Sequence, residues 1–233
     1  MMIYDKILDE ALPLLKGAEI IDYAFGINYI LVKTTIGMGA AYTITQDADS
    51  EIMLRDYKKG NPAELAEELY RSSNSFESGI GLALINSALN NKPSSREDVF
   101  KTECLKGKKV AMVGYFTPML HMFRESDLKI FELKDMEGTH KPSEAAEIMP
   151  ECDMVIITGV TFVNKTFHTY LPHIKKDAVK IALGLSCPMS KHVQAEGFII
   201  GGARVLNYEA TIGCMLHGMN PTRKSGAVDR VWL

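Results

Sequence analysis

The chain has 233 residues, of which 46% are hydrophobic, and its formal net charge is −3. This length can supply one large core or two smaller ones, and the slightly acidic balance without a long basic run argues against a nucleic-acid surface. The longest apolar stretches are strand-sized, far short of the ~20 residues that a membrane span needs, and the first residues lack the pattern of a signal peptide, so we expect a cytoplasmic protein.

The first part of the chain is predicted to open with an amphipathic helix that ends at Gly17. Its apolar residues recur at helical spacing, and a glycine at that place is typical of a helix C-cap. Strand-like runs follow over residues 19–25, 29–36 and 40–45. The short turn over 26–28 predicts an antiparallel hairpin between the first two, and Gly37-Met38-Gly39 separates the second strand from the third.

Two helices are expected next. Pro62 suits the first position of a helix that runs to about Arg71, with Asn61 as its N-cap. Ser75 is the expected cap of a second helix, over about 77–90. We therefore predict a small α+β domain over residues 1–92 and a polar linker over 93–104.

The remaining residues, 105–233, alternate strands and helices. Repeated βα units with short connections predict an α/β domain with a doubly wound, Rossmann-like parallel sheet. The expected strands are 109–113, 129–133, 154–158, 179–183 and 198–200, and the expected helices are about 118–125, 143–149, 164–173 and 189–195.

The first βαβ unit indicates a ligand site at the carboxyl ends of the strands, where Gly114 follows one strand and Glu132 ends the next. The GxGxxG fingerprint is absent, since Tyr115 and Phe116 follow the single glycine, and this argues against an ordinary NAD dehydrogenase. A methyltransferase-like or other degenerate Rossmann site fits better, with Glu132 accepting hydrogen bonds from ribose hydroxyls. The alternative is a tight turn and a solvated carboxylate.

Polar residues and glycines also follow the third and fourth strands of this sheet. Asn164 is a suitable N-cap for a helix whose free N–H groups could hold an anion, although capping alone explains it equally well. Residues after the fourth strand could form an anion nest with nearby amides. The candidate binding residues of these two segments are Thr158, Gly159, Asn164, Thr166, Gly184 and Ser186.

Three further observations concern polar and sulfur side chains. Asn86 lies inside an apolar helix and needs a partner, either backbone or a ligand at the domain junction. Cys187 is either a nucleophile or a quiet buried thiol. The cysteines and histidines form no recognisable metal set, and no Ser-His-Asp arrangement can be argued.

Taken in order, several segments resemble one family, the putative heavy-metal chelation proteins, over almost the whole chain. The segment over residues 157–166 is the most specific. Leu185 stands where a proline is expected and Val160 where a threonine is expected. The segments that carry the resemblance are 37–43, 83–88, 112–116, 131–132, 157–166 and 184–186.

The resemblance implies an enolase-N-terminal-like domain followed by a Rossmann-like domain. It implies a protein that binds or acts on a small pterin-like, flavin-like or siderophore-like metal-chelating molecule in a cleft between the two domains. An S-adenosylmethionine-dependent methyltransferase-like enzyme, a non-catalytic metabolite-binding module and an interaction protein with a vestigial nucleotide fold stay open. Turnover, cofactor and oligomeric state are undetermined at this point, and a homodimer is one option.

Overall fold

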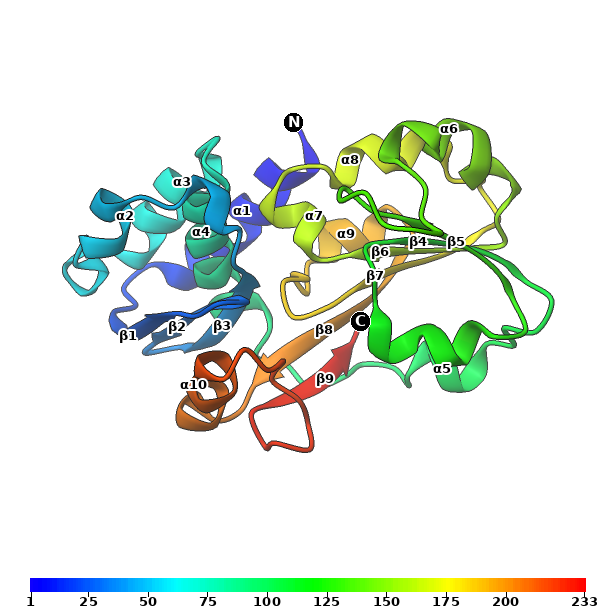
Figure 1. Ribbon diagram of the computed structural model, residues 1–233. Helices are drawn as coiled ribbons and strands as arrows, with labels where there is room; N and C mark the ends of the chain where they lie inside the picture. Colours follow the sequence, from blue (N-terminus) through cyan, green and yellow to red (C-terminus); the bar gives the residue numbers. More distant parts are fainter.

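The structure, a computed structural model, has two α/β domains built on separate sheets (Figure 1). It describes residues 1–101 and 103–233 in full, and residue 102 only through the course of helix α5. The N-terminal domain holds a three-stranded sheet and the C-terminal domain a six-stranded one. The expected α/β class is therefore confirmed.

The N-terminal domain is an antiparallel meander with helices on one face. The predicted hairpin is present, since the first two strands pair in antiparallel fashion across the turn at residues 26–28. Asn61 caps its helix with its side chain and Pro62 opens it, as expected. The elements are α1 (Ile3–Leu15), β1 (Ile20–Phe25), β2 (Tyr29–Thr34), β3 (Gly37–Tyr42), the 3-10 turns η1 (Thr45–Asp47) and η2 (Tyr57–Lys59), and helices α2 (Ser50–Leu54), α3 (Pro62–Arg71) and α4 (Ser75–Leu89).

Two local predictions for this domain were wrong. Residues 37–39 do not separate two strands but begin β3, which turns back from β2 after only two residues. A Cβ on Gly39 would lie 2.1 Å from the Ala83 carbonyl oxygen, so this glycine serves the close approach of α4 to the sheet. Asn74, not Ser75, caps α4, and its side chain accepts hydrogen bonds from two backbone amides.

The C-terminal sheet has the strand order β5-β4-β6-β7-β8-β9. The first five strands in this order are parallel and only β9 is antiparallel. Figure 1 shows α6 and α8 on one side of this sheet and α5 on the other, as a doubly wound fold requires. The strands are β4 (Lys109–Val113), β5 (Asp127–Phe131), β6 (Met154–Thr158), β7 (Val179–Leu183), β8 (Phe198–Val205) and β9 (Val228–Trp232).

The helices of this domain are mostly shorter than predicted. The expected helix over 164–173 begins only at Phe167 and ends in a 3-10 turn, and the one over 118–125 is a 3-10 segment. The helices and 3-10 turns (η) of this domain are α5 (Val99–Thr102), η3 (Thr117–Phe123), η4 (Pro142–Glu144), α6 (Ala145–Ile148), η5 (Met149–Glu151), α7 (Val160–Val163), α8 (Phe167–Tyr170), η6 (Leu171–His173), α9 (Lys191–Ala195) and α10 (Tyr208–Leu216).

The two domains are packed together along two surfaces. One cluster of buried apolar side chains runs from α1 and α4 into α7 and α8, and a second joins β2 and β3 to β8 and α10. In Figure 1, α10 lies against the three-stranded sheet, although it belongs to the other end of the chain. Among the described residues, we find no helix with the length and apolar character needed to cross a membrane.

Candidate functional site

The carboxyl edge of the six-stranded sheet has its topological switch beside β4, because β5 and β6 lie on opposite sides of that strand. Ligands of open α/β sheets bind in the crevice at such a point. Gly114 and Thr158 meet there, and a Cβ on Gly114 would lie 3.0 Å from Thr158 Cγ2. Gly114 also has a positive φ of 91°. The turn after β4 therefore requires glycine at this position both for its backbone conformation and for lack of space.

Glu132 holds the neighbouring strand ends together. Its carboxylate accepts hydrogen bonds from the backbone amides of Tyr115 at 3.2 Å and Leu133 at 2.8 Å. The Tyr115 side chain is exposed, whereas Phe116 packs against the apolar cluster under the sheet. This part of the edge therefore keeps a half-exposed carboxylate beside an exposed aromatic ring.

The next part of the edge is covered by the N-terminal domain. Ser186 is buried, and its Oγ accepts a hydrogen bond from the Tyr42 amide at 2.8 Å. Gly159 lies against the same loop, since a Cβ there would be 2.5 Å from the Cys187 amide nitrogen, and Gly184 has a φ of 125°. Ser186 thus makes a contact between the domains, while Gly159 and Gly184 shape the loop that carries it.

Two residues singled out from the sequence lie inside the protein core. Asn86 is fully buried and donates to the Ala40 carbonyl at 2.9 Å, while its Oδ1 has no hydrogen-bond partner within the described part of the chain. Burial raises the pKa of the Cys187 thiol, which keeps the thiol protonated. Cys187 therefore fits an unreactive buried thiol better than a nucleophile. The residues described in the structure contain no group of three or more His, Cys, Asp or Glu that could hold a metal ion.

A cavity of about 450 Å³ lies between the two domains. The start of α1 and the segment after α3 form its N-terminal side, and the turn between α7 and α8 forms the other side. Asn164 is the one residue of the sequence-based candidate set that lines it. The full lining is Met2, Tyr4, Asp5, Leu8, Tyr70, Arg71, Ser72, Ser73, Ser75, Val163, Asn164 and Lys165.

The turn between α7 and α8 is held by Asn164. Its Oδ1 accepts hydrogen bonds from the Thr166 amide at 3.2 Å and the Thr166 hydroxyl at 2.7 Å. Asn164 is thus not the cap of α8, since Thr166 occupies that position. Lys165, between them, has a φ of 57° and is the single non-glycine residue with positive φ in the described chain. Such backbone strain is concentrated at functional sites.

The Lys165 amine is held inside the cavity wall. Nζ donates to the Ser78 hydroxyl at 2.8 Å and to the Phe162 carbonyl at 3.2 Å, and it lies 3.0 Å from the centroid of the Tyr70 ring. Desolvation by burial lowers its pKa to about 6, because the protein offers no compensating carboxylate at this place. The side chain therefore carries a neutral amine at pH 7.

Two phenols stand beside this amine. Burial raises the pKa of Tyr4 to about 12; its neutral hydroxyl contacts His168 Nδ1 at 2.9 Å and accepts from the His168 amide at 3.2 Å. The Tyr70 hydroxyl is buried without a hydrogen-bond partner in the described structure. The site thus combines a neutral amine, a phenol–imidazole pair and an aromatic face.

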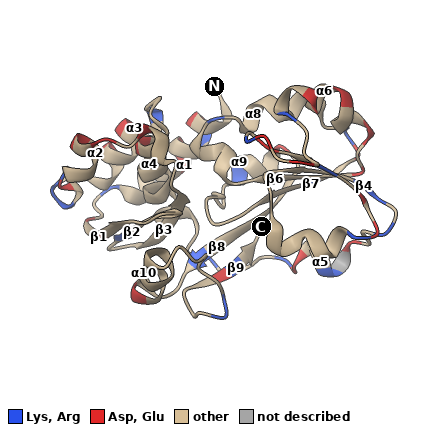
Figure 2. Ribbon diagram, viewed as in Figure 1, with Lys and Arg blue, Asp and Glu red and all other residues tan. Residues whose placement is uncertain are grey.

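The charged side chains at this cavity neutralise one another. Arg71 pairs with Asp5 at 2.8 Å and with Glu67 at 3.5 Å. In the view of Figure 2, Lys and Arg are interspersed with Asp and Glu over both domains. The cavity therefore suits an organic ligand of low net charge better than a polyanion.

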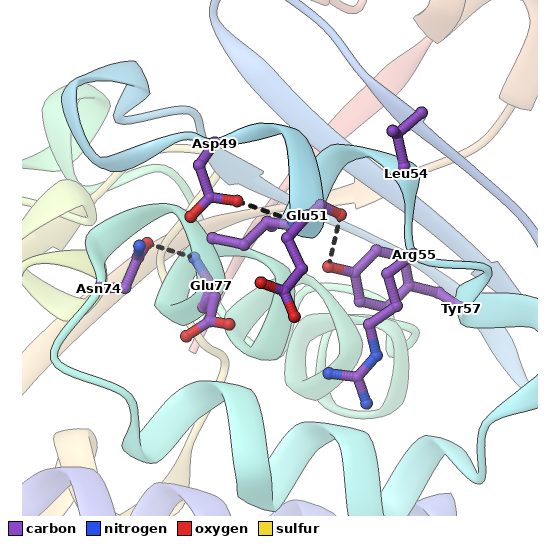
Figure 3. A pocket seen from close by; sticks show the side chains of 8 residues that line it. Asp49, Glu51, Leu54, Arg55, Tyr57, Asn74 and Glu77 are labelled. Carbon is purple, nitrogen blue, oxygen red and sulfur yellow. Dashed lines mark hydrogen bonds between the residues drawn. The ribbon is translucent and has the colours of Figure 1, made fainter.

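A second hollow, of about 720 Å³, lies within the N-terminal domain around α2 (Figure 3). Several of its polar groups already have partners: Asp49 caps α2, Asn74 caps α4, and the Tyr57 hydroxyl donates to the Ile52 carbonyl at 3.0 Å. Glu77 lines this hollow and accepts from the Ser72 hydroxyl of the interdomain cavity at 2.5 Å. These contacts give Asp49, Asn74 and Tyr57 structural roles.

Four residues of this site were not predicted from the sequence: Lys165, Tyr4, Tyr70 and His168. Lys165 lies within the segment that carried the resemblance most specifically, but only its burial by the other domain distinguishes it from a surface lysine. Tyr4 and Tyr70 lie on helices at positions that match the spacing of the apolar residues, so both are expected to be ordinary core residues. No local pattern links residues that are more than 150 positions apart, as Tyr4 and His168 are.

Comparisons with known proteins match both parts of this two-domain fold. Family models described as putative heavy-metal chelation match residues 98–231 and residues 4–89. The chain therefore belongs to the putative heavy-metal chelation family, as the sequence resemblance indicated.

Similar proteins share the fold over nearly the whole chain. An uncharacterised protein of Methanocaldococcus jannaschii is 28% identical over 207 residues, which is 78% of each chain. A crystal structure of a protein of unknown function from Desulfitobacterium hafniense has a TM-score of 0.84 at 22% identity and covers 99% of this chain and 97% of its own. One from Pyrococcus horikoshii has a TM-score of 0.80 at 19% identity, covering 100% and 99%.

Proposed function

We propose that this protein binds a small, partly planar metal-chelating molecule of the pterin, flavin or siderophore type in the cavity between its two domains. The observation that carries the proposal is the cavity itself, whose volume of about 450 Å³ is within the range typical of small-molecule sites. Sites between domains are common, because each domain contributes one wall.

The chemistry of the lining supports an organic ligand. Tyr70 and Tyr4 offer aromatic surface, against which a conjugated ring can stack. Ser73 and Ser75 bring side-chain hydroxyls, which can donate to or accept from ring carbonyls and nitrogens. In this proposal, the groups that chelate the metal belong to the ligand, and the protein recognises the organic part.

A thermal-shift screen tests the proposal. The panel holds pterins, flavins and catechol-type and hydroxamate-type chelators, each with and without Fe³⁺, Cu²⁺ or Zn²⁺. A ligand at 100 times its dissociation constant stabilises a folded protein by about 2.7 kcal/mol, which is a visible shift. We expect a shift for at least one chelator class and none for the metals alone. A shift caused by metal alone, or by no member of the panel, contradicts the proposal.

A second candidate is an S-adenosylmethionine-dependent methyltransferase-like activity, supported by the position of Glu132 at the sheet switch point beside Gly114. An acid at this position of a nucleotide-binding fold accepts hydrogen bonds from ribose hydroxyls. Calorimetric titration with S-adenosylhomocysteine tests it, since binding that Glu132→Gln weakens by tenfold or more supports this candidate. Absence of heat with the wild-type protein removes it.

A further inference from the structure

The Lys165 amine is fixed in position at the interdomain cavity. It lines the interdomain cavity, and its Nζ is oriented by hydrogen bonds to Ser78 Oγ at 2.8 Å and to the Phe162 carbonyl at 3.2 Å. The backbone of this residue has a positive φ of 57°.

Two aromatic rings surround the amine at the cavity. Tyr4 on α1 and Tyr70 on α3 are the titratable groups packed around Nζ, and both present ring faces, at 5.4 and 3.0 Å from ring centroid to Nζ. His168 on α8 reaches this group through the Tyr4 hydroxyl. Asp5 and Arg71, which also line the cavity, are paired with each other. The ring faces attract the charged form, whereas burial of the amine disfavours it and lowers the pKa of Lys165 to about 6.

We propose that Lys165 forms a covalent imine with a small aldehyde or ketone bound in the interdomain cavity. The lone pair of Nζ attacks the carbonyl carbon and makes the C–N bond, while the carbonyl oxygen takes up a proton. Loss of this oxygen as water, which carries away both hydrogens of the amine, leaves the C=N bond, so the step needs neither oxidant nor reductant. A lysine desolvated in an apolar pocket is a recognised nucleophile of this kind.

The neighbouring hydroxyls can move the protons that the step requires. Ser78 accepts from the amine and in turn donates to the Val163 carbonyl at 2.7 Å. Tyr4 holds its proton, and its hydroxyl contacts the exposed residue His168. Ser78 is therefore a positioning residue for the amine, and the Tyr4–His168 pair is a proton source at the cavity.

The inference rests on the proposed function in one respect, since both use the same cavity. Reductive trapping tests it separately. The full-length protein is incubated with glycolaldehyde, glyoxylate or benzaldehyde and cyanoborohydride, and the modified residue is found by peptide mass mapping. At pH 7, a lysine with a pKa of about 6 has roughly a thousandfold larger neutral fraction than one with an ordinary pKa, so we expect Lys165 to be modified first.

Two readouts keep this test decisive. In the wild type, the rate of trapping at Lys165 should level off above about pH 7, whereas the rate at a lysine with an ordinary pKa keeps rising toward about pH 10. Lys165→Met should abolish the early adduct, and Lys176→Met should leave it unchanged. Modification spread over the surface lysines and the terminal amine, with none at Lys165, overturns the inference.

The two hypotheses fail in different ways. Binding of a chelator in the thermal-shift screen together with no trapping at Lys165 rejects the imine and leaves the proposed function standing. Selective trapping at Lys165 together with a silent chelator panel supports the imine and rejects the proposed ligand class.

Discussion

At the scale of single residues, Lys165 makes the stability of the fold depend on pH. Its pKa falls from an ordinary value in the unfolded chain to about 6 in the native protein, because the native environment desolvates the amine. Between about pH 6 and pH 10 the unfolded state therefore binds more protons than the native state, and stability rises with pH. The contribution of the neutral Lys165 amine to stability is fully present above the pKa that this lysine has in the unfolded chain. It is lost as the pH falls through about 6.

Lys165→Met removes this dependence. The apolar side chain carries no charge to desolvate, so we expect the variant to be more stable than the wild type at about pH 6.5, by an advantage that shrinks as the pH rises. The difference in free energy of unfolding should change by about 1.4 kcal/mol for each pH unit at most. Urea unfolding of both proteins at several pH values measures it. Lys176→Met is the control. A difference in free energy of unfolding between Lys165→Met and the wild type that does not change with pH would contradict this explanation.

At the scale of secondary-structure elements, Gly39 sets the distance between β3 and α4. Gly39→Ala would bring a Cβ to 2.1 Å from the Ala83 carbonyl oxygen and 2.2 Å from the Ser87 amide nitrogen. Both are backbone atoms, so the helix has to move away from the sheet. We expect a loss of stability of about 1–3 kcal/mol, measured as a lower midpoint of urea unfolding.

Gly213→Ala is the matched control for this change. Gly213 lies within α10, and a Cβ there would meet no heavy atom within 4 Å. Because alanine favours helix over glycine by up to about 1 kcal/mol, this variant should be unchanged or slightly more stable. Equal destabilisation by both changes would show that the close approach at Gly39 is not the cause.

Local signals explain which elements could be predicted from the sequence. The Asn61-Pro62 pair marked the start of α3 correctly, because capping depends on neighbouring residues only. Residues 37–39 were misread because the need for glycine comes from α4, more than 40 positions further on. The end of β8, α10 and β9 were not predicted, since Gly201 and Gly202 interrupt the apolar run and only pairing with β9 continues the strand.

The candidate site was predictable in part for the same reason. The sheet order follows from βα alternation, so Gly114, Glu132 and Thr158 could be expected at one edge, and the structure brings Gly114 and Thr158 into contact. The interdomain cavity depends on how the two domains pack. Nothing around Lys165 in the sequence indicates that Tyr70 covers its amine.

At the scale of the whole molecule, Asn90 ties the two domains together. This buried side chain donates to the Cys187 carbonyl at 3.0 Å and the Ala203 carbonyl at 3.3 Å, and its Oδ1 accepts from the Met189 amide at 2.9 Å. Asn90 follows α4 of the N-terminal domain, and all three partners belong to the C-terminal domain. The two domains are therefore expected to unfold together.

Asn90→Ala should weaken this coupling. Leaving buried backbone groups without partners costs about 1–3 kcal/mol, and both domains should lose protection in hydrogen exchange. Asn91→Ala is the control, since Asn91 bonds only to carbonyls of its own domain, those of Ile36 and Ser87. Faster exchange confined to the N-terminal domain in Asn90→Ala would contradict the account.

The central claim, that the interdomain cavity holds the ligand, is tested most directly by calorimetric titration of the best chelator from the screen against the wild type and Ser73→Phe. Ser73 is exposed at the cavity, so a phenyl ring there fills the space without entering the core. Ser143→Phe places the same ring on an exposed site of the other domain and serves as the control. We predict that Ser73→Phe weakens binding at least tenfold, by about 1.4 kcal/mol, and that Ser143→Phe binds like the wild type. Equal affinity of all three proteins would place the ligand elsewhere.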